Sequence, residues 1–207
     1  MPAPVKIYFA SSNPGKLAEF RALAENSAAE ASSTTFRVEA LPGFESLSPF
    51  EENAPTFGEN ALGKALYYSK LSDEIVFADD SGLVVPALGG APGVYSARYA
   101  GPDATSGDRI NKLLQELAGK PRKERAAHFC CVIAVISQDL PIAVISNRVD
   151  GEILEIPRGT GGFGYDPIFY LPELDKTFAE LMPQEKNLYS HRGKAFRRML
   201  SFLNTPS

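Results

Sequence analysis

The chain has 207 residues, of which 44% are hydrophobic and 22% are charged, a composition typical of one globular domain or of one domain with two lobes. Its formal net charge of −4 argues against broad, sequence-independent binding to nucleic acid, which needs a basic face. No apolar run approaches the ~18 residues of a membrane span, so we expect no membrane partner.

The two cysteines, Cys130 and Cys131, are neighbours within an apolar run. Adjacent cysteines cannot form a normal structural disulfide, which fits a reducing compartment. The first ten residues contain no convincing secretory signal. We therefore expect a cytoplasmic protein. A small phosphorylated ligand stays compatible with the negative net charge if a local cluster of Lys and Arg, or a metal, neutralises it.

Residues 5–10 predict a strand, and Asn13-Pro14 then predicts the start of a helix, because Asn is a good N-cap and Pro is favoured at the first helical position. Free N–H groups at a helix start favour an anion, and Lys16 adds a positive charge there. An ordinary capped helix with a solvated lysine explains the same residues, and the loop lacks the glycine pattern of a P-loop. Residues 26–35 predict a flexible connection or a frayed helix end.

After a second predicted strand and an acidic loop, residues 56–70 predict a helix that opens with a Thr-x-x-Glu capping box. Asn60 and Lys64 are four residues apart and hence share one face of this helix. That face is either a solvated stripe or part of a site, because Glu51 and Glu52 lie just before the helix.

Residues 75–78 predict a short apolar strand that delivers Asp79 and Asp80 into a Ser-Gly turn. Successive strand residues point to opposite faces, so the two carboxylates should not act as one pair. We expect one of them to face a cleft and the other to face structure. A carboxylate at a strand end, followed by a glycine-rich loop, is a plausible place to hold a divalent cation.

The middle of the chain predicts a helix and a sheet. Residues 103–117 have the apolar stripe of an amphipathic helix. Residues 126–137 and 141–149 predict an antiparallel hairpin buried on both faces, and residues 151–156 predict a further strand.

Residues 157–166 contain four glycines, with Phe163 and Tyr165 among them. Glycine lets a backbone approach a flat ligand closely. We expect both rings to have little side-chain cover. A glycine-flanked aromatic residue is a natural stacking platform for a base, although an ordinary packed loop aromatic explains the run equally well.

The last predicted helix has Ser190 as its N-cap, which places His191 and Arg192 at the helix start. Cations are disfavoured there unless an anion or an acceptor shares the site. A local conflict of this kind points to function.

Neither a Ser-His-Asp nor a Cys-His nucleophile pattern occurs, and two histidines are too few for a His-rich metal site. What remains is a set of carboxylates, scattered lysines and arginines, a helix start and an aromatic ring in a glycine loop. This set suits a nucleoside triphosphate with Mg²⁺.

The sequence resembles the inosine triphosphate pyrophosphatases of the bacterial type, also called XTP/dITP diphosphatases or noncanonical purine NTP pyrophosphatases. The matching runs occur in family order and span nearly the whole chain: residues 12–16, 57–65, 78–101, 159–169, 176–181 and 190–193. The Ala-Asp-Asp-Ser-Gly and Phe-Gly-Tyr-Asp-Pro-Ile-Phe runs are specific, whereas Asn-x-x-Lys alone is weak.

This resemblance implies Mg²⁺-dependent hydrolysis of ITP, dITP and XTP to the monophosphate and pyrophosphate by a homodimer that cleanses the nucleotide pool. It also implies an α/β fold, with an elongated mixed β-sheet flanked by helices. Residues 1–207 would form one such domain, and its two lobes would hold the active site in the cleft between them.

By matching position, the resemblance makes Asp80 the general base and a metal ligand. Glu51, the first acid of the Glu51-Glu52 pair, would be the second metal ligand, while which of the two acids meets the metal stays open. Lys64 is a further phosphate candidate. The other residues carried over as substrate contacts are Ser11, Ser12, Asn13, Pro14, Gly15 and Lys16 at the phosphates, Ser81, and Phe163, Gly164, Tyr165, Asp166, Lys186, His191 and Arg192 around the base.

Two rival interpretations remain. A non-catalytic nucleotide-binding or sensor module would keep the glycine loop and the basic residues but would need no cation at Asp80. A pyrophosphatase acting on modified pyrimidine nucleotides is the nearer alternative.

Overall fold

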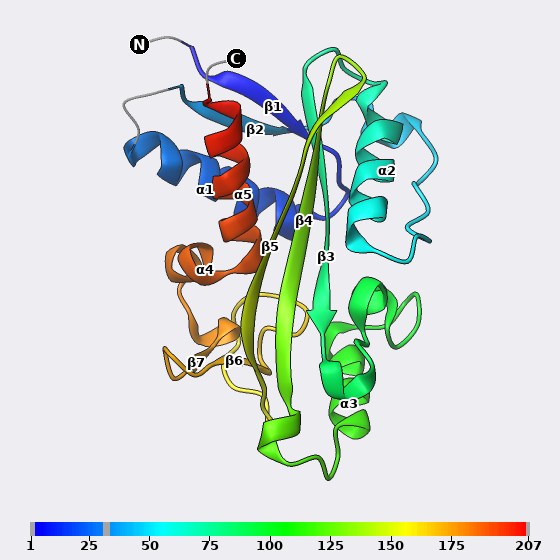
Figure 1. The fold of residues 1–207 in the computed structure, drawn as a ribbon, viewed down its shortest axis with the longest axis vertical. Helices are drawn as coiled ribbons and strands as arrows, with labels where there is room; N and C mark the ends of the chain where they lie inside the picture. Colours follow the sequence, from blue (N-terminus) through cyan, green and yellow to red (C-terminus); the bar gives the residue numbers. More distant parts are fainter. Residues whose placement is uncertain (1–2, 31–33, 206–207) are drawn as a thin grey trace. The chain divides into compact units, whose positions relative to one another are not determined.

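A seven-stranded sheet with helices beside it makes up the computed structural model, which describes residues 3–30 and 34–205 (Figure 1). The strand order is β2-β1-β3-β4-β5-β6-β7. The strands are β1 (Val5–Phe9), β2 (Phe36–Ala40), β3 (Ile75–Val84), β4 (Ala126–Ser137), β5 (Leu140–Ile153), β6 (Phe169–Leu171) and β7 (Lys176–Thr177). The helices are α1 (Pro14–Glu30), α2 (Phe57–Ser69), α3 (Ser106–Glu116), α4 (Pro183–Tyr189) and α5 (His191–Leu203).

The sheet is mixed. Strand β1 pairs in parallel with β2 and with β3, whereas β5 with β6 and β6 with β7 pair antiparallel. The α/β class and the mixed sheet flanked by helices are thus confirmed. Among the described residues, no helix is both long and apolar enough to cross a bilayer.

The chain divides into two compact units. Unit 1 comprises Met1–Asp80, Cys131–Asn147 and Arg192–Ser207, and unit 2 comprises Ser81–Cys130 and Arg148–His191. Strands β3, β4 and β5 contribute residues to both units.

Phenylalanine rings fill the core of unit 1. Phe9 of β1, Phe20 of α1, Phe77 of β3 and Phe196 of α5 are fully buried, with ring centroids 4.8 to 5.9 Å apart in the contacting pairs. Each buried ring of this size stabilises the fold by about 2–3 kcal/mol. This cluster packs α1 and α5 on the strands, whereas α2 contributes nothing to it and is separated from α5 by β3 and β4 in Figure 1.

Helix α1 extends further than the sequence predicts. Its last turn covers part of residues 26–35, where we expected a flexible connection or a frayed end. The rest of that stretch includes residues 31–33, which lie outside the described part of the chain.

Strand β3 is also longer than predicted. The sequence indicates a strand that stops before Asp79 and Asp80, but β3 continues to Val84. The predicted Ser-Gly turn was wrong, and both carboxylates lie inside the strand. The reason is a second apolar run beyond Gly82, in which Leu83 is fully buried.

The predicted hairpin is confirmed in β4 and β5. Its turn residues, Gln138 and Asp139, have φ angles of 50° and 61°, as a two-residue type I′ turn requires. The strand predicted at residues 151–156 is in part the continuation of β5. Burial on both faces holds for most of β4 but not for β5, whose residues are exposed or half-buried except for Val149 and Ile153.

A second aromatic cluster fills unit 2. Phe129 of β4, Phe169 of β6 and Phe178 lie with ring centroids 4.7 to 5.8 Å apart. Leu113 of the predicted amphipathic helix, observed as α3, is buried in the same cluster. The short helix α4 was not predicted; it begins with Pro183 at its first position, a common helix start.

Candidate active site

The loop between β1 and α1 ends in a helix cap, as the sequence predicts. The side-chain Oδ1 of Asn13 accepts a hydrogen bond from the backbone N–H of Lys16 at 3.1 Å. The Oγ of Ser11 accepts one from the N–H of Asn13 at 3.2 Å. Pro14 is the first helical residue. The free N–H groups and the dipole at this helix start therefore favour the binding of an anion.

Asp79 lies on the face of β3 that meets α1 and α5, and its side chain is fully buried. Its Oδ1 accepts a hydrogen bond from Nζ of Lys16 at 2.9 Å, and its Oδ2 is 3.7 Å from Nε of Arg192. Burial by itself raises the pKa of Asp79, but the charges of Lys16, Arg192 and Lys64 outweigh it and hold the pKa at about 2. Asp79 is thus an ionised carboxylate that faces structure.

Asp80 follows in the strand and meets α2 instead. It is 5% exposed, and its Oδ2 accepts a hydrogen bond from Nδ2 of Asn60 at 3.0 Å. Burial and then the charge of Glu52 raise the pKa of Asp80 to about 6, against the opposing charges of Lys64 and Lys16. A carboxylate tuned in this way is a candidate proton acceptor near neutral pH.

Of the two neighbouring acids, Glu52 is the one near Asp80. Its Oε1 is ion-paired with Nζ of Lys64, whereas Glu51 is exposed. Burial lowers the pKa of Lys64, but the carboxylates of Asp79 and Glu52 outweigh burial and raise it. Lys64 therefore keeps its positive charge beside Glu52.

Asn60 and Lys64 are both buried, so the face that they share on α2 is not a solvated stripe. Besides holding Asp80, the side chain of Asn60 accepts a hydrogen bond at Oδ1 from the backbone N–H of Ala54 at 3.0 Å. The sequence alone assigns no role to Asn60, although its spacing from Lys64 places both residues on one helix face. Ser81, the next residue of β3, is half-buried.

A cavity of about 300 Å³ in unit 1 brings the first loop and the Glu52–Lys64 pair together. Ser11 and Ser12 supply hydroxyl groups to its wall, and Glu52 and Lys64 supply charges. The remaining lining residues are Phe44, Glu45, Leu47, Pro49, Phe50 and Tyr68. A cavity lined by both apolar and polar side chains is typical of small-molecule sites.

The carboxylates of Asp80 and Glu52 are suitable ligands for Mg²⁺. Their mutual repulsion, which raises the pKa of Asp80, is the repulsion that a divalent cation would relieve. In the described residues, no group of three or more His, Cys, Asp or Glu side chains is placed to hold a metal. Two carboxylates are enough for Mg²⁺, which usually takes its other ligands from water and substrate phosphates.

In unit 2, Asp166 anchors the glycine-rich loop. Its Oδ2 accepts hydrogen bonds from the backbone N–H of Phe163 at 2.8 Å and from Nζ of Lys186 at 2.7 Å. Gly162 has a φ of 70°, and a Cβ at this position would lie 2.0 Å from the same Oδ2. A side chain cannot fit there, which explains this glycine.

The two aromatic residues of the loop differ in exposure. Phe163 is 37% exposed, and Nζ of Lys186 lies 4.8 Å from its ring centroid. Tyr165 is 3% exposed, and its hydroxyl donates a hydrogen bond to the carbonyl oxygen of Ser96 at 3.0 Å. The prediction of little cover was therefore wrong for Tyr165, because the segment of Ser96, distant in sequence, packs on it. Of the two rings, Phe163 can serve as a stacking platform.

The two cations at the start of α5 are both buried. The ring of His191 stacks on Phe129, with centroids 4.7 Å apart and planes 7° apart. Arg192 is ion-paired through Nη1 with Glu19 and through Nε with Asp79. Protein carboxylates thus supply the anions that a cation at a helix start requires. That both residues surround a base stays a prediction.

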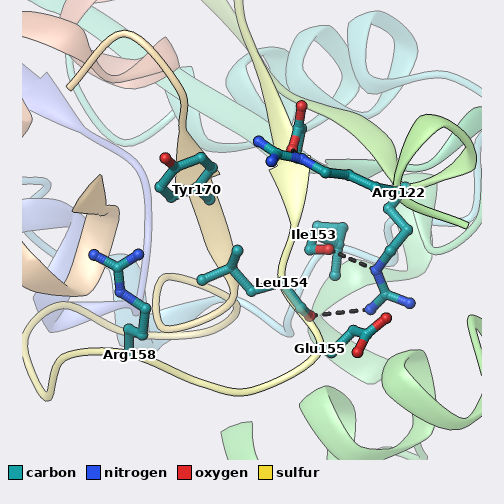
Figure 2. A pocket seen from close by; sticks show the side chains of 8 residues that line it. Arg122, Ile153, Leu154, Glu155, Arg158 and Tyr170 are labelled. Carbon is teal, nitrogen blue, oxygen red and sulfur yellow. Dashed lines mark hydrogen bonds and ion pairs between the residues drawn. The ribbon is translucent and has the colours of Figure 1, made fainter. Parts of the chain in front are cut away.

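A second cavity, of about 290 Å³, lies in unit 2 and is lined by residues outside the predicted site (Figure 2). Three arginines border this cavity, and each of them interacts with other groups of the protein. Arg125 donates to backbone carbonyl groups, while Arg122 and Arg158 are ion-paired with Glu152 and Glu180.

Comparison with known proteins gives consistent matches. The sequence model of the Ham1 family matches residues 7–202. A protein of Geobacillus kaustophilus named dITP/XTP pyrophosphatase is 49% identical over 194 residues, which cover 94% of this chain and 92% of that protein. A protein of the same name from Gloeobacter violaceus is 47% identical over 195 residues, covering 94% and 92%.

Solved structures agree with these relatives. A HAM1 protein from Coxiella burnetii has a TM-score of 0.83 and 42% identity, covering 96% of this chain and 98% of that one. The Staphylococcus aureus Ham1 protein has a TM-score of 0.81 and 39% identity, covering 96% and 97%.

Proposed function

Because this chain belongs to the Ham1 family, we propose that it is a nucleoside triphosphate pyrophosphatase that hydrolyses noncanonical purine nucleotides. Its substrates would be dITP, XTP and ITP, and its products the monophosphate and pyrophosphate. The names of the relatives support this class of substrate. The observation that carries the proposal is the grouping of Asp80, Glu52 and Lys64 with the cavity that the first loop also lines.

Asp80 and Glu52 would hold Mg²⁺. When bound, this ion would neutralise charge on the phosphates and lower the pKa of a ligated water. Glu52 takes the place that the sequence resemblance gave to Glu51, because Glu52 lies beside Asp80 and Lys64 while Glu51 is exposed. In this proposal Asp80, held by Asn60, orients the attacking water toward the α-phosphorus and accepts its proton.

The positive charges near the first loop suit the triphosphate, which carries about four negative charges near neutral pH. Lys16 and the N-terminus of α1 would contact the phosphates, and Lys64 would do so from α2. Their role is to stabilise the negative charge that develops as pyrophosphate leaves.

The base would stack on the exposed ring of Phe163. Lys186, fixed by Asp166, presents an N–H donor beside that ring. A donor there would suit the 6-keto group of inosine and xanthine and would disfavour the amino group of adenine. In the same proposal, Mg²⁺ is required and the protein is a cytoplasmic homodimer.

Pyrophosphate release from dITP, XTP, ITP, GTP, ATP and modified pyrimidine triphosphates, with and without Mg²⁺, tests the function. We expect release from the first three, and only with Mg²⁺. Binding of dITP without release would favour the sensor module, and turnover restricted to pyrimidines would favour the other rival.

Two neighbouring variants test the metal ligand. Glu52→Gln should raise the Mg²⁺ concentration needed for half-maximal rate by at least about tenfold, because a carboxylate ligand is lost. Glu51→Gln is the matched control and should leave that concentration unchanged. The reverse pattern would restore Glu51 as the ligand and contradict the assignment of Glu52.

A further inference from the structure

A row of alternating charges runs through unit 1 behind Asp80. Its members are Glu19, Arg192, Asp79 and Lys16. Glu19 is ion-paired with Nη1 of Arg192, whose Nε is 3.7 Å from Oδ2 of Asp79. The other oxygen of Asp79, Oδ1, accepts the hydrogen bond from Lys16. The row therefore connects α1, the start of α5 and the middle of β3.

This row is shielded from water, since the side chains of Asp79 and Arg192 are 0% and 4% exposed. Its ends are more open, with 16% exposure at Lys16 and 19% at Glu19. Charges interact strongly in such surroundings, and removing one partner leaves an uncompensated buried charge. The formal charges of the row sum to zero. Arg192 and Asp79 each interact with two neighbours in the row, so a change in one ion pair affects the next.

The two oxygens of Asp79 serve different cations. Oδ1 serves Lys16 on α1, and Oδ2 serves Arg192 on α5. Glu19 is ion-paired with Nη1 of the same Arg192. If Glu19 lost its charge, the attraction of Arg192 toward Asp79 would go unopposed, and Arg192 would compete with Lys16 for the carboxylate.

We propose that Glu19 is a positioning residue: by holding Arg192, it keeps Oδ1 of Asp79 for Lys16 and so sets where the Lys16 ammonium group lies. The catalytic part of this inference rests on the proposed function, in which Lys16 contacts the phosphates. Nothing in the sequence resemblance assigns a role to Glu19.

The variant Glu19→Gln should fold. Glu19 lies at the more exposed end of the row, and α1 and α5 are held together by apolar contacts such as that between Phe20 and Phe196, whose centroids are 5.1 Å apart. Glu19→Gln keeps the size of the side chain and one accepting oxygen while removing the negative charge. Glu25→Gln, on an exposed position of the same helix, is the matched control for the loss of one negative charge.

The first measurement is the NMR signal of the Lys16 ammonium group in the protein without nucleotide, assigned with Lys16→Arg. Glu19→Gln should shift this signal, Glu19→Asp should restore part of the shift, and Glu25→Gln should leave the signal in place. An unmoved Lys16 signal in Glu19→Gln would overturn the inference.

The second measurement is kcat/KM for dITP in a double-mutant cycle. Glu19→Gln should lower it about tenfold in the wild-type background, in line with couplings in ion-pair networks. In a Lys16→Ala background it should cause no further loss, because the effect passes through Lys16. An equal loss in both backgrounds would show a general structural role and reject the inference.

The two proposals fail in different ways. Absence of pyrophosphate release by the wild-type protein would refute the proposed function. The Lys16 signal would still decide whether Glu19 positions this lysine.

Discussion

The two faces of β3 shift the pKa values of adjacent carboxylates in opposite directions. Asp79 and Asp80 are both buried, yet the pKa of the first is lowered to about 2 and that of the second is raised to about 6. Burial raises both values, so burial cannot explain the difference. The difference comes from the neighbours: Asp79 contacts Lys16 and lies near Arg192, whereas Asp80 accepts a hydrogen bond from the neutral Asn60 and is repelled by the negative charge of Glu52.

This contrast separates a structural carboxylate from a reactive one. A fully paired carboxylate stabilises the fold and is poorly placed to accept a proton. A carboxylate beside a second negative charge costs stability and is suited to cation binding and proton transfer. We therefore expect substitutions on the two faces to have opposite effects on stability and activity.

The largest expected effect is that of Asp80→Asn on turnover. Pyrophosphate release from dITP should fall by ~10²–10⁴-fold, because the proton acceptor is lost. The metal-free variant should be as stable as the wild type at pH 7 or more stable, by roughly 3 kcal/mol at most, since ionising Asp80 opposes folding. Near-normal turnover would rule out Asp80 as the base.

On the other face, Asp79→Asn should destabilise the protein by about 3–5 kcal/mol, since it leaves the partly buried Lys16 and the buried Arg192 without their carboxylate. Denaturant unfolding at pH 7 measures this loss, with Asp80→Asn as the matched neighbour. If both variants had the same stability, the contrast between the faces would be incorrect.

The contrast also predicts opposite pH dependences. The lowered pKa of Asp79 stabilises the fold above its unfolded value of 3.8, and this contribution is lost as the pH falls toward about 2. The raised pKa of Asp80 does the reverse: its contribution to stability is greatest below 3.8 and is lost as the pH rises to about 6. Unfolding of metal-free Asp80→Asn at pH 4 and pH 7, compared with the wild type, should show a gain at the higher pH only.

The smallest expected effect is on the pKa of Asp80 itself. Glu52→Gln in the metal-free protein should lower this pKa by about one unit, because it removes the neighbouring negative charge. Lys64→Met should raise it by a similar amount, since the opposing positive charge is lost. Carboxyl NMR titration of the two variants checks both signs, and shifts of the same sign would show that these charges do not control Asp80.

Much of this arrangement follows from local sequence. The cap at Asn13 and Pro14, the helix opened by Thr56, and the opposite directions of Asp79 and Asp80 all depend on residues close together in the chain. Such features need only propensity and strand alternation, which a single sequence displays.

What the sequence missed depends on contacts between distant segments. The cover over Tyr165 comes from Ser96, and the partner of Arg192 is Glu19, 173 residues away. The extent of β3 was misjudged because Ser81 and Gly82 suit both a turn and a strand, and burial of Leu83 decided between them. The choice of Glu52 over Glu51 likewise required its pairing with Lys64.

Carboxyl ¹³C titration of Asp79 and Asp80 in the metal-free protein measures the difference between the two faces of β3. We expect Asp79 to titrate near pH 2 and Asp80 near pH 6. Titration of both groups near 3.8, or Asp79 above Asp80, would contradict the assignment of one carboxylate to structure and the other to chemistry.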